Sequence, residues 1–295
     1  MNCENYYAAV VIYNQCCSDS ITCKNLKKIC QNEPDLKIII ADNSTRKEIK
    51  EANKLQCEKY QWEYEDMEGN RGLSVAYNHI IKNLPRLSEA DCVIWFDDDT
   101  NITREYFQSL KKCIENNPNA EIFVPVIQGI DGKIYSPNER GFLKNHFIKN
   151  KNDKVEKKRF NAINSCMAVK TNLYKEYQYD EKLFMDMVDQ KFCRDMSIAD
   201  KKFAIIDVEV TQNFFQRSDN LTVEKVWTRY NIRIKDFMNY ANEDALHRWL
   251  GVVKVALWGI DMAIRCKSIK ILFMCLRKGI KCAVELSKEN KRRVK

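Results

Sequence analysis

The sequence lacks the segments that identify membrane-spanning, secreted or repetitive proteins. None of its apolar runs reaches about 20 consecutive residues, the length that a bilayer-spanning helix needs. The amino-terminal residues MNCENYYAAVVIY lead straight into a strand-like segment, so we expect no secretory signal peptide. There is no internal repeat and no low-complexity segment. The 295 residues suffice for one large domain with a smaller appendage, and a hydrophobic share of 45% is too high for a disordered chain.

The 13 cysteines form no paired CxxC spacing, which excludes a legible zinc ribbon or redox motif. Because we expect no signal peptide, we expect most of them to be small buried hydrophobic residues in a reducing cytoplasm. Histidine is scarce, and a lone histidine is more often a surface or core residue than a ligand. We therefore assign no role to His79, His146 or His247. These features predict a cytoplasmic protein without a zinc ribbon.

The net charge of +8 is spread unevenly along the chain. Residues 248–295 carry 13 Lys and Arg and only three acidic residues, so the preceding part sums to about −2. Lys or Arg interrupts every apolar run of this tail, which suits helices that lie on an anionic membrane surface. Two helices that pack on the core with their basic residues facing water explain the same pattern. Both interpretations stay open, and we predict a domain at residues 1–240 and a basic amphipathic helical tail at 241–295.

The first third of the chain alternates between short apolar strands and longer helices. Strand patterns occupy residues 7–13, 36–41, 61–66 and 92–96. Helix patterns lie between them at residues 21–30, 46–59 and 73–83. This alternation predicts an α/β fold in which a parallel sheet has helices on both faces. In such sheets ligands bind beyond the carboxyl ends of the strands.

Beyond residue 99 the pattern becomes mixed. Helix patterns cover residues 103–116, 189–199 and 222–240, and strand patterns cover 121–126, 165–170 and 202–208. We expect Thr103 to cap the first of these helices. Residues 144–159 are polar and basic with little periodicity, which predicts a mobile loop. Such a loop serves either as a lid over a site or as a solvated surface segment.

Three consecutive carboxylates, Asp97, Asp98 and Asp99, follow the apolar strand CVIWF. Carboxylates this close repel one another unless a cation neutralises them, and hard oxygen ligands suit Mg²⁺ or Mn²⁺. Such an ion in turn bridges a substrate diphosphate. The alternative is an acidic helix N-terminus capped by Asp99 or Thr100. The position at a strand end, near other polar strand ends, favours the metal.

The segment NRGLSVAYN at residues 70–78 joins a strand to a helix. Gly72 allows a tight turn there, and the helix start offers free backbone N–H groups to an anion. Arg71 is placed to pair with a phosphate. An ordinary capped helix explains the same residues.

Two further carboxylates, Asp186 and Asp189, lie three residues apart in the segment LFMDMVD at residues 183–189. Either is a candidate to deprotonate an acceptor hydroxyl within hydrogen-bond reach. The alternative is an acidic loop with a helix cap at Asp189.

Together these motifs resemble the family 2 glycosyltransferases, inverting enzymes with the GT-A fold. The resemblance rests on their order: VIYN at residues 11–14, ADNS at 41–44, NRGLSVAYN at 70–78 and FDDD at 96–99. The later LFMDMVD looks like the rhamnosyltransferase branch, and DDD is also seen in galactofuranosyltransferases. The likeness spans roughly residues 7–240. It implies a Rossmann-like nucleotide-diphospho-sugar transferase fold, with a mixed, mainly parallel sheet, followed here by amphipathic C-terminal helices.

The resemblance also implies roles for matching positions. Asp189 matches the catalytic base, with Asp186 as a second candidate, and Asp97 and Asp99 match the outer acids that contact the ribose and the metal-bound diphosphate. Asp42 would contact the nucleotide base. The remaining implied donor contacts are Tyr13, Asn14, Asn43, Asn70, Arg71, Gly72, Asn78 and Asp98. Asn164 and Ser165 fall where the family places contacts to the acceptor and the sugar.

Three positions depart from the family pattern. Cys166 stands where a Gly is usual, and Lys191 stands where this branch usually has an acid. Gln212 stands where a His often assists the metal or the diphosphate, which bears on metal geometry and metal dependence.

The predicted activity is inverting transfer of a sugar from a dTDP- or UDP-linked donor, such as rhamnose or galactofuranose, with Mn²⁺ or Mg²⁺. The basic tail suggests a lipid-linked saccharide acceptor, as in capsule or O-antigen assembly at the cytoplasmic face of the membrane. A sugar nucleotidyltransferase should have a glycine-rich basic loop after the first strand, where this chain has YNQCC. A non-enzymatic membrane- or nucleic-acid-binding module is disfavoured because the charge is confined to the tail. A GT-A protein that binds donors without turnover stays open.

Overall fold

The computed structural model describes residues 3–142, 144–150, 153–212 and 222–293. Residues 151–152 of the expected loop and 294–295 of the expected tail therefore lie outside the described part. The chain forms two compact units. The first, here called the sheet unit, comprises residues up to 179 and the described residues from 189 to 212. The second, the helical unit, comprises residues 180–188 and 222–293. Whether residues 241–295 act as a separate tail stays a prediction.

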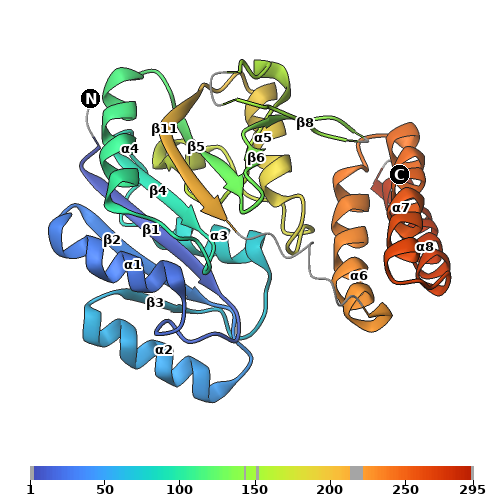
Figure 1. Cartoon of the computed structure of the whole chain (residues 1–295), viewed down its shortest axis with the longest axis horizontal. Coiled ribbons are helices and arrows are strands. Elements are labelled where there is room, and N and C mark those ends of the chain that lie inside the picture. Colours follow the sequence, from blue (N-terminus) through green and yellow to red (C-terminus); the bar gives the residue numbers. More distant parts are fainter. Residues whose placement is uncertain (1–2, 143, 151–152, 213–221, 294–295) are drawn as a thin grey trace. The chain divides into compact units, whose positions relative to one another are not determined.

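The sheet unit is built on a sheet with the strand order β11-β5-β10-β4-β1-β2-β3 (Figure 1). Its strands are β1 (Asn5–Ile12), β2 (Leu36–Asp42), β3 (Glu63–Asp66), β4 (Asp91–Phe96), β5 (Ile122–Gly129), β10 (Met167–Lys170) and β11 (Phe203–Gln212). Only β10 runs antiparallel to its neighbours in this order, and β6 (Ile134–Ser136) pairs antiparallel with β5. The expected α/β class with a mainly parallel sheet is therefore confirmed. The carboxyl ends of the six parallel strands meet at one edge.

The helices of the sheet unit begin and end close to the expected residues. They are α1 (Ile21–Ile29), α2 (Lys47–Tyr60), α3 (Leu73–Asn83), α4 (Arg104–Asn116) and α5 (Val188–Ile198). Short 3₁₀ segments lie at η1 (Cys30–Asn32), η2 (Lys157–Arg159) and η3 (Thr171–Lys175). Ser20 caps α1 by accepting a hydrogen bond from the N–H of Cys23. Thr103 occupies the cap position of α4 but makes no side-chain hydrogen bond there, so that part of the expectation was wrong.

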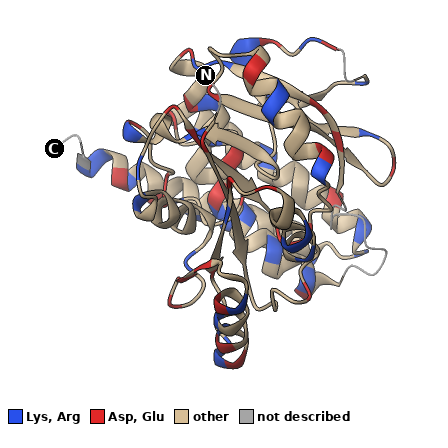
Figure 2. Ribbon diagram, turned by 90° about the vertical axis from the view of Figure 1, so that its left-hand side faces the viewer, with Lys and Arg blue, Asp and Glu red and all other residues tan. Residues whose placement is uncertain are grey.

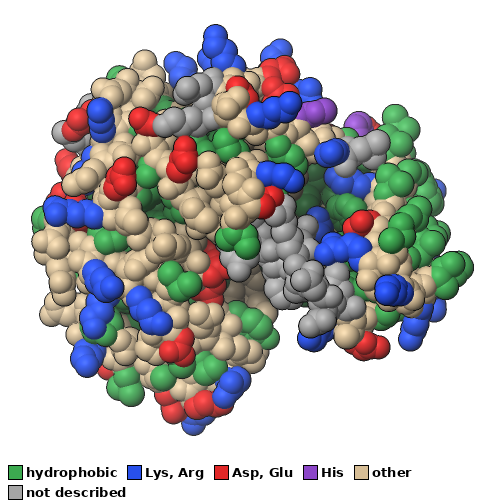
Figure 3. All heavy atoms as spheres, viewed as in Figure 1, with side chains coloured by type: hydrophobic (Ala, Val, Ile, Leu, Met, Phe, Trp, Pro, Cys, Tyr) green, Lys and Arg blue, Asp and Glu red, His purple; other side chains and the backbone are tan. Residues whose placement is uncertain are grey.

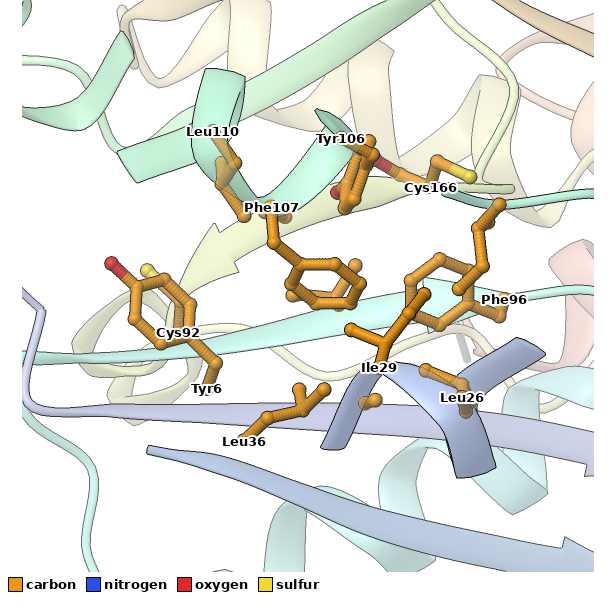
Figure 4. Packing of buried hydrophobic residues seen from close by; sticks show 14 of the residues in the cluster. Tyr6, Leu26, Ile29, Leu36, Cys92, Phe96, Tyr106, Phe107, Leu110 and Cys166 are labelled. Carbon is orange, nitrogen blue, oxygen red and sulfur yellow. The ribbon is translucent and has the colours of Figure 1, made fainter. Parts of the chain in front are cut away.

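Successive residues of β4 point to opposite faces of the sheet and so define two cores. On one face Phe96 packs with Tyr106 and Phe107 of α4 and with Leu26 of α1 (Figure 4). On the other face the ring of Trp95 lies 4.3 Å from the ring of Tyr77 in α3. Fully burying each such side chain contributes about 1.5–3 kcal/mol, which explains why this strand is apolar from Cys92 to Phe96. Charged residues lie mainly on the helices and loops, and the strands carry few (Figure 2).

The expected mobile loop at residues 144–159 contains ordered structure where it is described. Its β8 (His146–Phe147) pairs antiparallel with β7 (Asn138–Glu139), which also pairs with β9 (Phe160–Asn161). Apart from β8 and η2, the described residues of this stretch are irregular, as expected of a loop, and its mobility stays a prediction. Strands of two residues are too short to leave a periodic pattern in the sequence.

All 13 cysteines are free, and nine of them are buried. This confirms their expected role as small buried hydrophobic residues, since the reduced thiol packs like an apolar group.

The helical unit contains α6 (Val223–Tyr240), α7 (Ala245–Arg265) and α8 (Lys270–Arg293). Two glycines allow α7 and α8 to pack closely. A Cβ on Gly259 of α7 would lie 3.1 Å from the Cβ of Cys275, and a Cβ on Gly279 of α8 would lie 3.1 Å from a methyl group of Val255. Phe237 of α6 packs on Trp258 of α7, with ring centroids 4.9 Å apart. In the described part of the chain, no helix combines the length and apolarity needed to cross a membrane.

Candidate active site

Hydrogen bonds connect the loops that follow β1 and β2. The backbone N–H of Asn14 donates to Oγ of Ser44 over 2.8 Å, and the Asn14 side-chain oxygen accepts from the N–H of Thr45 over 2.9 Å. Asn14 has a φ of +50°, a left-handed conformation that Asn tolerates better than most residues. The neighbouring Tyr13 is half exposed. Asn14 therefore shapes this edge of the sheet, and Tyr13 is available to a ligand.

Asn43 connects the same edge to the turn before α3. Its amide nitrogen donates to the carbonyl of Gly72 over 3.3 Å, and its oxygen accepts from the N–H of Arg71 over 3.1 Å. Gly72 has a φ of +85°, which favours glycine, and it occupies the N-cap position of α3 without a side-chain cap. Asn70 accepts from the N–H of Gly72 over 3.3 Å, and Arg71 is exposed. The turn thus leaves the first N–H groups of α3 uncapped by side chains.

Asp42 lies at the end of β2 with its side chain fully buried. Its carboxylate accepts hydrogen bonds from the N–H of Ser44 at 2.8 Å, from Nδ2 of Asn53 at 2.9 Å and from the hydroxyl of Tyr64 at 3.2 Å. These bonds fix the loop after β2. The implied contact of Asp42 with a nucleotide base stays a prediction.

Asn78, another implied donor contact, hydrogen-bonds the backbone of the chain itself. Its side chain donates to the carbonyl of Tyr179 and accepts from the N–H of the same residue, both over 2.9 Å. The ring of Tyr179 in turn packs on Tyr77 and Trp95. Asn78 therefore anchors the chain where it leaves the sheet unit, and its expected contact with the donor stays a prediction.

The three carboxylates after β4 lie in a turn that α1 holds in place. Oγ1 of Thr22 donates to the carbonyl of Asp97 over 2.5 Å and accepts from the N–H of Thr100 over 2.9 Å. Oγ of Ser20 donates to the carbonyl of Asp98 over 2.6 Å. No helix begins here, since α4 starts only at Arg104. The alternative that these acids merely cap a helix was therefore wrong.

The charged forms of the Asp97 and Asp98 carboxyl groups are disfavoured in this turn. Burial raises the pKa of Asp97 to about 6, the charges of Asp99 and Asp98 raise it further, and a hydrogen bond from Gln212 opposes the rise. Burial and Asp99 also raise the pKa of Asp98, while Asp99 itself is exposed. Among the described residues, no Lys or Arg stabilises the charged forms of Asp97 and Asp98. Oxygen ligands in this condition fit a divalent cation.

Gln212 ends β11 directly beside Asp97. Its Nε2 donates to Oδ2 of Asp97 over 2.9 Å, and its buried Oε1 has no hydrogen-bond partner in the structure. The position that the resemblance gives to a metal-assisting His thus does lie at the carboxylates. Among the described residues, no three His, Cys, Asp or Glu side chains form a group arranged to hold a metal ion.

Asn164 has two further unpartnered polar atoms. Its side chain is buried, and neither its oxygen nor its nitrogen has a hydrogen-bond partner within range. Ser165 is used internally, because its Oγ lies 2.7 Å from Oγ1 of Thr100. Cys166 has a φ of +61°, which explains why the family usually has Gly at this point. Buried amides without partners cost free energy, and a bound ligand would satisfy them.

Asp189 lies in the first turn of α5, directly after Met187 and Val188. Met187 has a φ of +65°, so the chain turns sharply just before the helix. Burial raises the pKa of Tyr77, and the charges of Asp97 and Asp189 raise it further. Both carboxylates therefore lie close enough to the buried Tyr77 to act on it electrostatically.

Asp186 belongs to the helical unit and is already paired. Its carboxylate forms a two-pronged ion pair with the guanidinium of Arg229 in α6. Asp186 thus already has a cationic partner in this structure. Its role as a second candidate base stays a prediction. Lys191, the other departure on this segment, pairs with Asp195 one turn further along α5 at 2.8 Å.

Asp236 is a residue that the sequence did not single out. It is fully buried in α6, and its carboxylate accepts hydrogen bonds from three consecutive N–H groups at 2.8–3.0 Å. These belong to Phe184, Met185 and Asp186. We call this arrangement the Asp236 clamp. It fixes the segment that immediately precedes α5 and Asp189.

Comparisons with other proteins agree with this arrangement. The sequence model of glycosyl transferase family 2 matches residues 8–178, and no curated protein sequence matches the chain. A mannosyltransferase from Pyrobaculum calidifontis, solved with GDP-Man and Mn²⁺, is similar at a TM-score of 0.57 and 12% identity, over 94% of this chain and 87% of that one. TarS 1-349 of S. aureus is similar at a TM-score of 0.51 and 15% identity, over 97% of this chain and 73% of that one.

GalNAc-T7, solved with UDP, GalNAc and Mn²⁺, is similar at a TM-score of 0.56 and 14% identity, over 81% of this chain and half of that one. At such identities the solved structures share the fold, which is the GT-A fold of glycosyltransferases. The family match covers more than half of the chain and includes the strand ends, the turn before α3 and the three carboxylates. This chain belongs to glycosyl transferase family 2 and is a glycosyltransferase.

Proposed function

We propose that the enzyme transfers the sugar of a nucleotide-diphospho-sugar to an acceptor hydroxyl in a single displacement that inverts the anomeric configuration, with Asp189 as the base. The observation that carries this proposal is a set of unsatisfied polar groups: the crowded carboxylates of Asp97 and Asp98, and the buried side chains of Gln212 and Asn164, which have atoms without a hydrogen-bond partner. A divalent cation held by the acid-rich turn would suit the diphosphate, and the carboxylate of Asp189 suits the hydroxyl of the acceptor. The unpartnered amide of Asn164 supplies both a donor and an acceptor for sugar hydroxyls.

The proposed cofactor is Mn²⁺ or Mg²⁺, held by Asp97 and Asp99. Divalent ions in enzymes of phosphorylated substrates commonly take one or two carboxylates together with substrate phosphates. Two of the similar structures contain Mn²⁺ beside a nucleotide or a nucleotide-sugar. When bound, the ion would neutralise charge that develops on the departing diphosphate.

The residues of this chain supply the remaining steps. The carboxylate of Asp189 accepts the proton of the acceptor hydroxyl as its oxygen bonds to the anomeric carbon. The bond from that carbon to the diphosphate oxygen breaks, and the nucleoside diphosphate leaves with the electron pair. Because the attack comes from the face opposite the leaving group, the anomeric configuration inverts. The exposed Tyr13 and Arg71 are the proposed contacts for the base and the phosphates.

The proposed donors are dTDP- or UDP-sugars, with rhamnose and galactofuranose as the first candidates. The proposed acceptor is a lipid-linked saccharide of capsule or O-antigen assembly, reached from the cytoplasmic face of the membrane. The basic helices at residues 248–293 support a peripheral membrane contact. A lipid-anchored acceptor is confined to the bilayer surface, so a contact of the enzyme with that surface would raise the local concentration of the acceptor.

A panel of nucleotide-sugars tests this function. We expect one dTDP- or UDP-sugar with Mn²⁺ to raise the melting temperature by several degrees, because a ligand that binds only the folded state stabilises it. The same donor should then be hydrolysed slowly in the absence of an acceptor. Binding without hydrolysis or transfer would identify a binding protein that has lost turnover. If no nucleotide-sugar shifts the melting temperature with either metal, the proposed function is wrong.

Replacement of Gln212 by leucine should weaken the metal-dependent binding of the donor by about tenfold. The change removes a hydrogen bond to a buried charged group, a loss of roughly 1.5–3 kcal/mol. Calorimetric titration of the donor with and without Mn²⁺ measures the effect. Gln128→Leu is the matched control, because Gln128 also donates to a carboxylate, that of Glu209 at 3.1 Å, but on the exposed surface of β5. If both variants lose the same donor affinity, Gln212 does not belong to the donor site.

A further inference from the structure

Helix α7 carries two apolar stripes on opposite sides. The buried stripe packs inside the helical unit and includes Gly251, Val255, Gly259 and Met262. The second stripe faces solvent. It consists of Leu246, Leu250, Val253, Leu257, Ile260 and Ile264. These residues recur at intervals of three and four, so they line one side of the helix over about 27 Å.

The solvent-facing stripe is a sustained apolar surface. Leu246 and Ile264, at its two ends, are 66% and 73% exposed. Trp249 on α7 and Ile269, Phe273, Ile280 and Val284 on or beside α8 are also exposed. Figure 3 shows hydrophobic side chains gathered over α7 and α8. Single exposed apolar residues are normal, but a continuous set of this size marks a surface that is covered by a partner.

Helices α7 and α8 with their link, here called the α7–α8 hairpin, are strongly basic. From Ala245 to Arg293, α7, α8 and their link carry twelve Lys and Arg and three acidic residues. The exposed bases Lys270, Arg277 and Lys281 of α8 lie within a turn of the exposed Phe273 and Ile280. This positive charge favours a lipid surface over a second copy of the chain as the partner. A second copy of the hairpin would bring two positive surfaces together, whereas a surface of anionic lipid complements both the charge and the apolar stripe.

We propose that the α7–α8 hairpin docks flat on an anionic lipid bilayer, with the solvent-facing stripe of α7 and Phe273 of α8 entering the boundary between headgroups and acyl chains. The helix lies in the membrane plane and does not cross it, in line with the absence of a spanning helix from the described residues. Lys and Arg beside the stripe contact lipid phosphates while their aliphatic stems stay in the boundary. This inference names the surface for the membrane contact proposed above and does not depend on which sugar is transferred.

Flotation of the full-length protein with vesicles tests the docking. We expect binding to vesicles that contain phosphatidylglycerol, weaker binding at high salt, and little binding to pure phosphatidylcholine. Leu257→Glu with Ile264→Glu should lower the binding constant by about 100-fold, because two apolar side chains no longer enter the lipid. Leu55→Glu with Ile198→Glu is the matched control. Leu55 is as exposed as Leu246, and both control residues lie in the sheet unit.

Fluorescence supplies a second readout. The emission of Trp249 should shift to shorter wavelength on anionic vesicles, and Trp249→Phe should abolish most of that shift. Circular dichroism and the donor-induced thermal shift should be unchanged in the Glu variants, which separates loss of docking from loss of folding or of donor binding. The proposal is overturned if the Glu variants float like wild type. It is also overturned if ultracentrifugation shows a dimer that these substitutions dissociate while vesicle binding is absent.

Discussion

Replacement of Asp97 by asparagine is expected to abolish sugar transfer and, at the same time, to stabilise the ligand-free protein. The carboxyl group of Asp97 is held in a buried site beside Asp98 and Asp99, which raises its pKa from 3.8 to about 6. Such a rise corresponds to at most roughly 3 kcal/mol against the charged form. Asparagine removes this penalty and retains an oxygen for Gln212, so we expect the melting temperature at pH 7.5 to increase by about 3–6 °C.

The pH dependence of this gain has a definite sign. The folded state holds the proton of Asp97 more tightly than the unfolded state, so stability falls as the pH rises from about 4 to 6 and stays reduced above that. The advantage of Asp97→Asn should thus be largest above pH 6 and should vanish near pH 4. Thermal melts across this range measure it. An equal melting temperature at pH 7.5, or transfer that survives the change, would contradict the assignment of Asp97 to the metal and diphosphate.

Replacement of Asp189 by asparagine should lower the rate of transfer to the acceptor by about 10²–10⁴-fold and leave the donor affinity nearly unchanged. The amide cannot accept the proton of the attacking hydroxyl, whereas nothing in the proposed binding of the diphosphate involves Asp189. Transfer kinetics and donor titration, measured on the same preparation, separate the two effects.

Asp195→Asn is the matched control for Asp189. It makes the same chemical change on the same helix, where Asp195 pairs with Lys191. We expect it to leave the turnover within a small factor of wild type. If Asp189→Asn behaves like this control, the catalytic base is another residue.

The sheet of this protein could be predicted because its signal is local. Strands such as β4 are a continuous apolar run after their first residue, and α3 was expected at the residues where it occurs. The three carboxylates could be placed because a parallel sheet brings the carboxyl ends of its strands to one edge. The position of Gln212 beside Asp97 was implied by resemblance alone, since 115 residues separate the two in sequence.

The partners of individual polar side chains could not be predicted. Asp42 and Asn78 belong to recognisable motifs, yet their hydrogen bonds go to the chain itself, and only the folded structure reveals this. Asp236 looks like any polar residue of an amphipathic helix, because its burial depends on a segment about 50 residues away in sequence. The pairing of Asp186 with Arg229 could not be predicted either, because the two residues lie 43 positions apart in sequence.

The Asp236 clamp has a consequence for shortened forms of the protein. The chain leaves the sheet unit after residue 179, contributes residues 180–188 to the helical unit, and returns to the sheet unit in α5. The two units are therefore interleaved in sequence. Cutting the chain before α6 would therefore strip three N–H groups of their acceptor next to the proposed base. A truncation meant to remove only lipid contact must retain α6, or the inactivity that follows will be mistaken for a requirement for the membrane.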